Sequence, residues 1–154
     1  MSYFKLINGI KDLLDSDSRV KTITEGDIDD LDTYRQNIPT IAHIVVNGGS
    51  DLENLNTYNC EVSVLDIISE NNNETEDKFK GNDNKQEVYN LTDNIIRRFV
   101  LLFKKQAEGQ NIFLIGDPLY DKVIDDTTQN RLAGWEVSFT VGVPNNLIDV
   151  CEPI

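Results

Sequence analysis

Histidine and paired carboxylates are the side chains of this sequence that could perform acid–base chemistry. His43 is the only histidine, and it lies in the apolar run IPTIAHIVVNGG (38–49). No local motif places a serine or cysteine nucleophile beside it. We therefore expect His43 to be a structural histidine with satisfied ring nitrogens and not a general base.

Two groups of acidic residues resemble ligand sets but do not match the patterns of known sites. In EGDIDDLD (25–32), Gly26 precedes the acids, whereas an EF-hand loop has its glycine and a distal glutamate after alternating ligands. The second group, in which paired carboxylates would need a common cleft, is Asp117, Asp121, Asp125 and Asp126. Because turns are rich in aspartate, we interpret the first group as a solvated loop and the second as turn residues.

The cysteines and glycines indicate no cofactor. Cys60 and Cys151 are far apart in the chain and form no CxxC pair, so we expect two reduced thiols without a zinc site or a disulfide. The glycines of segment 47–50 lack the GxxxxGK spacing of a phosphate-binding loop. We expect no catalytic residue, cofactor or metal, and a protein that is not an enzyme.

The charge balance restricts the possible partners. The chain has 154 residues, with 14 Lys and Arg against 27 Asp and Glu, and a net charge of −13. Affinity for phosphate comes from Lys and Arg, so this balance argues against binding to nucleic acid or to an anionic membrane. An acidic surface still suits a protein that lets DNA pass without binding it.

The N-terminal stretch and the hydropathy pattern indicate an intracellular origin. MSYFKLINGIKDLLDSD has no signal-peptide pattern, because Lys5 and Asn8 interrupt any apolar run. No stretch approaches the roughly 18 apolar residues of a membrane span. We expect synthesis in the cytoplasm and no membrane contact.

Apolar spacing predicts the elements of the first half. Apolar residues at intervals of three and four predict a helix over 2–15. The acidic stretch 19–37 has few large apolar residues, and we expect a flexible arm, with a short strand near Val20 to Ile23.

Two strands are predicted next, over 38–49 and 57–68. We expect the first strand to end in a turn at Asn47-Gly48-Gly49 and to pair with the second as an antiparallel hairpin. Segment 69–84 has almost no apolar residue apart from Phe79, so we expect a second flexible arm.

A long helix follows this second arm. Asn84 and Glu87 form a start similar to a capping box, an apolar stripe runs from Val88 to Phe103, and Gly109 can end the helix. Lys104 and Lys105 lie where the helix dipole favours positive charge.

The remaining sequence predicts up to three strands. The clearest comes last, where Trp135 begins an alternation of apolar and polar residues that is typical of a sheet with one buried face. The order of elements predicts a single α+β domain over 1–154, with both helices packed on one face of a mostly antiparallel sheet.

Four stretches, in this order, carry a family resemblance: IAHIVVNGG, DKFKGNDNKQEVYN, IIRRFVLLFKK and RLAGWEVSFTVGVPNNLIDVC. Together they resemble small head-to-tail neck proteins of tailed bacteriophages, the tail-terminator-like family. The GNDN-x-x-E-x-x-N helix start and the LAGW before the last strand are similar to versions from phages of Bacteroidetes hosts, including crAss-like phages. The resemblance covers residues 38–151.

The resemblance implies a structural virion protein, made in the cytoplasm of the bacterial host. Subunits of that family form a sixfold or twelvefold ring in the head–tail connector between portal and tail, and the ring lines the DNA exit channel. The implied partners are further copies of the chain and the adjacent portal, connector and tail proteins, while DNA passes without specific binding. Another tail component, such as a tail-tube or stopper protein, is the alternative, and a small hydrolase or ligand-binding domain is less favoured.

The resemblance also implies roles for particular residues. Segment 69–84 would be an assembly arm that contacts a neighbour in the ring and becomes ordered on binding. Its candidate contact residues are Asp77, Lys78, Phe79, Lys80, Gly81, Asn82, Asp83 and Asn84. Glu87 and Trp135 would be structural.

Overall fold

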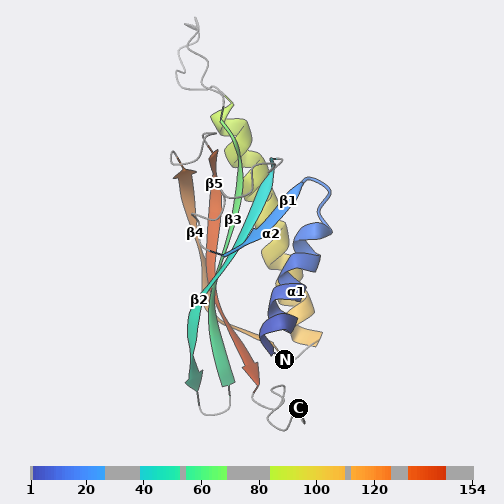
Figure 1. Ribbon diagram of the computed structural model, residues 1–154, viewed down its shortest axis with the longest axis vertical. Helices are drawn as coiled ribbons and strands as arrows, with labels where there is room; N and C mark the ends of the chain where they lie inside the picture. Colours follow the sequence, from blue (N-terminus) through green and yellow to red (C-terminus); the bar gives the residue numbers. More distant parts are fainter. Residues whose placement is uncertain are drawn as a thin grey trace, which may run out of the picture.

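Five strands in the described residues form one sheet, and two helices pack on the same face of it (Figure 1). The computed structural model describes residues 2–26, 39–52, 55–68, 84–109, 112–125 and 132–144. In chain order the elements are α1 (Ser2–Asp15), β1 (Thr22–Glu25), β2 (Ile41–Leu52), β3 (Leu55–Ile67), α2 (Lys85–Gly109), β4 (Phe113–Asp125) and β5 (Leu132–Pro144). The strand order is β1-β2-β3-β5-β4, with β1 parallel to β2 and all other neighbours antiparallel. The expected α+β class is confirmed.

The helices form where the apolar stripes predict them. On α1 the stripe becomes a buried face that includes Leu6, Ile10 and Leu14. On α2 the helix begins directly after Asn84, whose side-chain amide donates a hydrogen bond to the carbonyl of Ile67, 3.0 Å away. This bond fixes the start of α2 to the end of β3.

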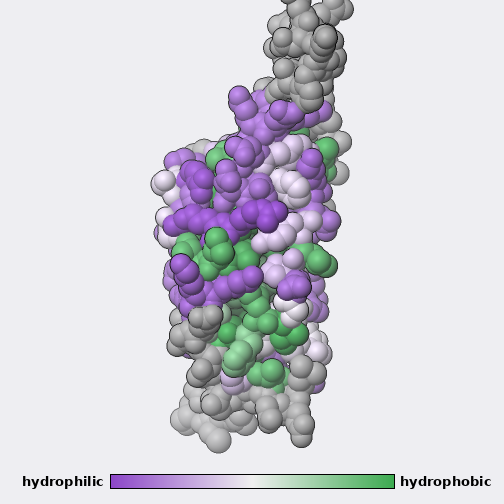
Figure 2. All heavy atoms as spheres, turned by 180° about the vertical axis from the view of Figure 1, so that it is seen from behind, coloured by the Kyte–Doolittle hydropathy of each residue, from purple (hydrophilic) through white to green (hydrophobic). Residues whose placement is uncertain are grey.

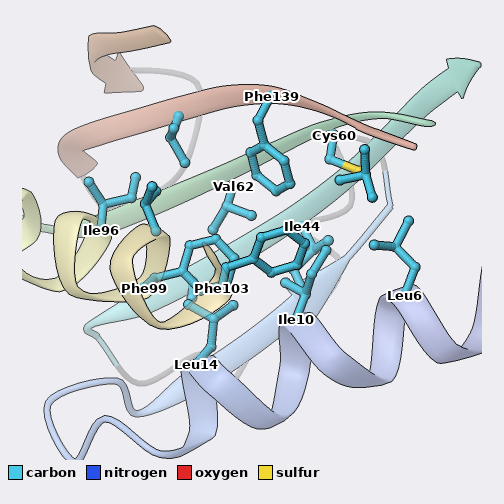
Figure 3. Packing of buried hydrophobic residues seen from close by; sticks show 14 of the residues in the cluster. Leu6, Ile10, Leu14, Ile44, Cys60, Val62, Ile96, Phe99, Phe103 and Phe139 are labelled. Atoms are coloured by element: carbon cyan, nitrogen blue, oxygen red, sulfur yellow. The ribbon is translucent and has the colours of Figure 1, made fainter. Parts of the chain in front are cut away.

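The core lies between the helices and the sheet (Figure 3). Phe103 on α2 and Phe139 on β5 have ring centroids 5.4 Å apart, and Phe99 packs on both rings. Leu6, Ile10 and Leu14 of α1 point into the same layer. The predicted alternation of β5 is confirmed, because Val137, Phe139 and Val141 are buried against the helices.

The hairpin of β2 and β3 is longer than expected. The predicted pairing is confirmed, but the predicted turn at Asn47-Gly48-Gly49 is wrong, because β2 continues through these residues to Leu52. A shift in register between Val46 and Gly48 inserts one extra residue, and Gly48 has a φ of 130°. A β-bulge with a positive-φ glycine therefore takes the place of the turn.

In the described residues of the last third of the chain two strands form, where up to three were expected. β4 runs through Gly116-Asp117-Pro118, and the register with β5 shifts between Ile115 and Leu119. Gly116 has a φ of 74°, which a bulge tolerates and a regular strand does not. Both bulges lie at the level of the Cys60–Phe139 pair, one on each side of β3 and β5.

The short strand expected near the start of segment 19–37 is present as β1. Arg19 donates hydrogen bonds of 2.9 and 2.7 Å to the carboxylate of Asp17, and β1 pairs with β2 from Thr22 to Glu25. This strand lies slightly later in the chain than the predicted segment, Val20 to Ile23. Residues 27–37 of the first arm and 69–83 of the second lie outside the described residues.

Candidate interaction surfaces

His43 is held by two hydrogen bonds on β2. Its Nε2 lies 2.8 Å from the carbonyl oxygen of Gly26, and its Nδ1 lies 2.7 Å from Oγ1 of Thr24. A carbonyl oxygen only accepts, so Nε2 carries a proton and donates it. The side chain is only 1% exposed. His43 therefore joins β2 to β1 and to the residue after it, and the expected structural role is confirmed.

The candidate carboxylates do not gather into a metal site. Asp117 and Asp121 lie within β4 and Asp125 ends it, so the interpretation of these three as turn residues is wrong. Asp126 lies outside the described residues. Across the described ranges, no group of three His, Cys, Asp or Glu side chains could hold a metal ion. No helix in these ranges is long and apolar enough to cross a membrane.

Trp135 joins the sheet to the first turns of α2. Its Nε1 donates a hydrogen bond of 3.0 Å to the carbonyl oxygen of Tyr89, and the two rings meet edge to face with centroids 6.4 Å apart. The ammonium group of Lys122 lies 4.8 Å from the Tyr89 ring centroid and 5.6 Å from that of Trp135. Glu87 is exposed on the first turn of α2, where its charge is favourable for the helix dipole.

The sheet face away from the helices, here called the open face, carries acidic residues and no Lys or Arg among the described strands. Lys122 is the only Lys or Arg in the five strands, and its contacts with Tyr89 and Trp135 place it on the helix side. The register pairs Asp121 with Glu136, and Glu61 with Ser138, on the open face. Burial, together with the nearby Glu61 charge, raises the pKa of the Glu136 carboxyl.

On one part of the open face the apolar side chains are buried, and on another part they are exposed to solvent. Ile41, Leu65 and Leu132 form a buried cluster on it. On β4, by contrast, Phe113, Ile115 and Leu119 are 50%, 38% and 67% exposed. A groove of about 240 Å³ lies beside the β4 bulge. It is lined by Ile115, Leu119, Asp117 and Glu61 among others.

We call this exposed region the β4 patch, and its members are Ile115, Leu119, Asp117, Asp121, Glu61 and Glu136. Leu119 lies at its centre. Asp117 and Asp121 flank Leu119 on the same strand. Glu136 lies on the neighbouring strand β5, and Glu61 lies one strand further, on β3. Within the described residues, these four carboxylates form no ion pair.

A second exposed surface lies on α2, and we call it the α2 patch. Leu101 is 61% exposed at its centre. The four residues three or four positions away, which are its neighbours on a helix surface, are all cations: Arg97, Arg98, Lys104 and Lys105. Seen from behind, the middle of the molecule carries hydrophobic side chains between two hydrophilic bands (Figure 2).

The cations of the α2 patch differ in whether they form ion pairs within the subunit. The guanidinium group of Arg97 forms an ion pair with the Asp93 carboxylate at 2.8 Å and lies over the Tyr120 ring. The guanidinium group of Arg98 lies 3.7 Å from the Asp17 carboxylate. Lys104 and Lys105 are exposed, and neither forms an ion pair with a carboxylate whose side chain the structure describes. These two of the four cations are therefore exposed on the helix surface without such an ion pair.

The predicted site residues that the structure describes, Asn84, Glu87 and Trp135, belong to neither patch. Of the candidate assembly residues 77–84, only Asn84 is described, and it anchors the start of α2. Both patches were missed by the sequence analysis, although the spacing around Leu101 is visible in the sequence. No protein-family model matches this chain, and no curated protein matches it.

Proposed function

We propose that this chain is a structural virion protein that forms a ring in the head–tail connector of a tailed bacteriophage. The ring would join the portal complex to the tail and surround the DNA exit channel. The observation that carries the proposal is the exposed apolar row of Phe113, Ile115 and Leu119 on a sheet face that the helices leave open. Grouped apolar side chains on a surface mark a site for another protein.

The motifs of the family resemblance have structural positions that suit this proposal. IAHIVVNGG forms most of β2, the GNDN stretch ends where α2 begins, and LAGW opens β5. The fold alone is compatible with many functions. The proposal therefore depends on the resemblance together with the exposed apolar surface, and not on the fold class.

The charge of the chain supports the passage of DNA without binding. Ion pairs between identical subunits leave the net charge of each subunit at −13. A ring of such subunits repels phosphate, because Lys and Arg do not outnumber the carboxylates. DNA moving through the ring would then meet no adhesive site.

Light scattering and negative-stain imaging of the purified chain test this proposal, together with mass spectrometry of virus particles. We expect ring-shaped oligomers, and the chain among the particle proteins. Gold-labelled antibodies should mark the neck; labelling along the tail would instead support a tail-tube protein. A chain that is absent from particles, or a monomer that turns over a substrate, would contradict the proposal.

A further inference from the structure

We propose that the α2 patch of one copy docks on the β4 patch of the next copy, so that subunits join head to tail. The inference rests on the proposed ring and names the surfaces that would close it. Each patch has a leucine at its centre, Leu101 in one and Leu119 in the other, and these are exposed by 61% and 67%.

The two patches have opposite charges. Leu101 is surrounded by four cations, and Leu119 by four carboxylates. The open face offers no Lys or Arg to the carboxylates among the described strands. Lys104 and Lys105 are exposed, and neither pairs with a carboxylate whose side chain the structure describes. Complementary charge of this kind guides association and fixes the register of an interface.

The two patches also match in size. From Arg97 to Lys105 the helix rises by about 12 Å, at 1.5 Å per residue. On β4, Ile115 to Asp121 runs beside Thr140 to Glu136 of β5, a stretch of about 13 Å at 3.3 Å per residue. A helix laid along β4 would therefore place its cations near the carboxylates and Leu101 near the groove beside Leu119.

The partner that fits both patches is a second copy of this chain. The patches lie on opposite sides of one subunit, the α2 patch on the helix layer and the β4 patch on the open face, so they do not meet within a single chain. A contact between two different patches of identical subunits repeats, and it forms a closed ring when the rotation closes. A contact between two identical patches would instead bring like charges together.

Charge reversal on each patch provides the test. The first variant carries Lys104→Glu and Lys105→Glu, and the second carries Asp117→Lys and Asp121→Lys. We expect each variant alone to self-associate at least about tenfold more weakly than the wild type in sedimentation velocity, because like charges then face each other. An equimolar mixture should restore association to within about threefold, since each reversed patch finds its complement on the other variant.

Matched controls reverse charges outside both patches. The first control is Lys21→Glu, at the residue just before β1. The second is Asp51→Lys, near the end of β2. We expect these variants to associate like the wild type, and circular dichroism should show all variants folded. Patch variants that associate normally, a mixture that restores nothing, or a wild type that stays monomeric at every concentration would each overturn the interface.

The outcomes separate the interface from the function. Rings in virus particles that tolerate both patch reversals would leave the connector role intact and show that other surfaces close the ring. Head-to-tail association of a chain that is absent from particles would support the interface and reject the virion role. Loss of association by one patch variant only would indicate a different partner surface for that patch, and would also overturn the proposal.

Discussion

Leu101 on α2 and Leu119 on β4 are the two most exposed large hydrophobic residues of the described chain, and they lie on opposite sides of the subunit. Cations surround the first and carboxylates surround the second. An isolated subunit leaves both leucines in water. This pairing of surfaces is the basis for expecting one copy to bind the next.

Salt should weaken self-association. Raising the ionic strength from about 0.05 M to about 0.5 M shortens the range of charge interactions to a few ångströms, so contacts between the α2 and β4 patches lose part of their attraction. We expect the dissociation constant to rise by about tenfold in sedimentation velocity. Association that is unchanged or stronger at high salt would indicate an apolar contact without the proposed charge pairs.

Glu136→Gln should stabilise the fold at high pH. Burial and the Glu61 charge raise the pKa of Glu136, so the folded state binds its proton more tightly than the unfolded state does. The wild type therefore loses stability as the pH rises through this raised pKa. We expect the glutamine variant to be more stable by about 0.5 kcal/mol at pH 8, a small value because solvent screens the site.

This advantage of the glutamine variant should disappear in acid. Below the ordinary pKa of glutamate the side chain is neutral in both states, so urea unfolding should give equal stabilities. Glu87→Gln is the matched control, because that side chain is exposed on the first turn of α2. Replacing Glu87 by glutamine removes a negative charge that interacts favourably with the helix dipole. We expect this to destabilise the folded state by about 0.3 kcal/mol. A Glu136→Gln variant that is less stable at pH 8 contradicts the prediction.

Trp135→Phe should loosen the attachment of α2 to the sheet. The substitution removes one of the donors to the Tyr89 carbonyl oxygen and replaces a ring near Lys122. We expect a loss of about 1 to 2 kcal/mol in urea unfolding. Lys122→Met keeps the hydrogen bond and should cost less, about 0.5 kcal/mol, because only the cation–π contact is lost. Equal costs for both substitutions would show that the hydrogen bond contributes little.

The Cys60 thiol should not react with thiol reagents in the folded protein. The side chain is buried on β3, and burial raises the pKa of its thiol to about 12, so the reactive thiolate is scarce at neutral pH. In a Cys151→Ser variant we expect no labelling by a maleimide until urea unfolds the chain. Rapid labelling under native conditions would mean that β3 opens locally or that the pairing around Cys60 is different.

Periodicity predicted the elements whose side chains meet one continuous core. The apolar stripe on α1 and the alternation after Trp135 each predict an element with one side buried in the core between helices and sheet. Both predictions are confirmed. Residue types that are common in turns were misleading at Asn47-Gly48-Gly49 and at Asp117. The same residue types serve a turn that reverses the chain and a bulge that lets the strand continue, and only cross-strand pairing separates the two.

The two patches differ in how far a sequence could reveal them. The cations around Leu101 follow from helix spacing alone once α2 is assigned. The carboxylates around Leu119 do not, because Glu61 and Glu136 come from strands that are distant in sequence. The β3–β5–β4 register brings them to the same face, and no local pattern predicts that register.

A cryo-EM reconstruction of the virus particle is the most direct measurement of the central claim. We predict a closed ring of this chain between the portal and the tail, with Leu101 of each copy facing Leu119 of its neighbour. A neck built entirely from other polypeptides, with this chain nowhere in the particle, would contradict the account.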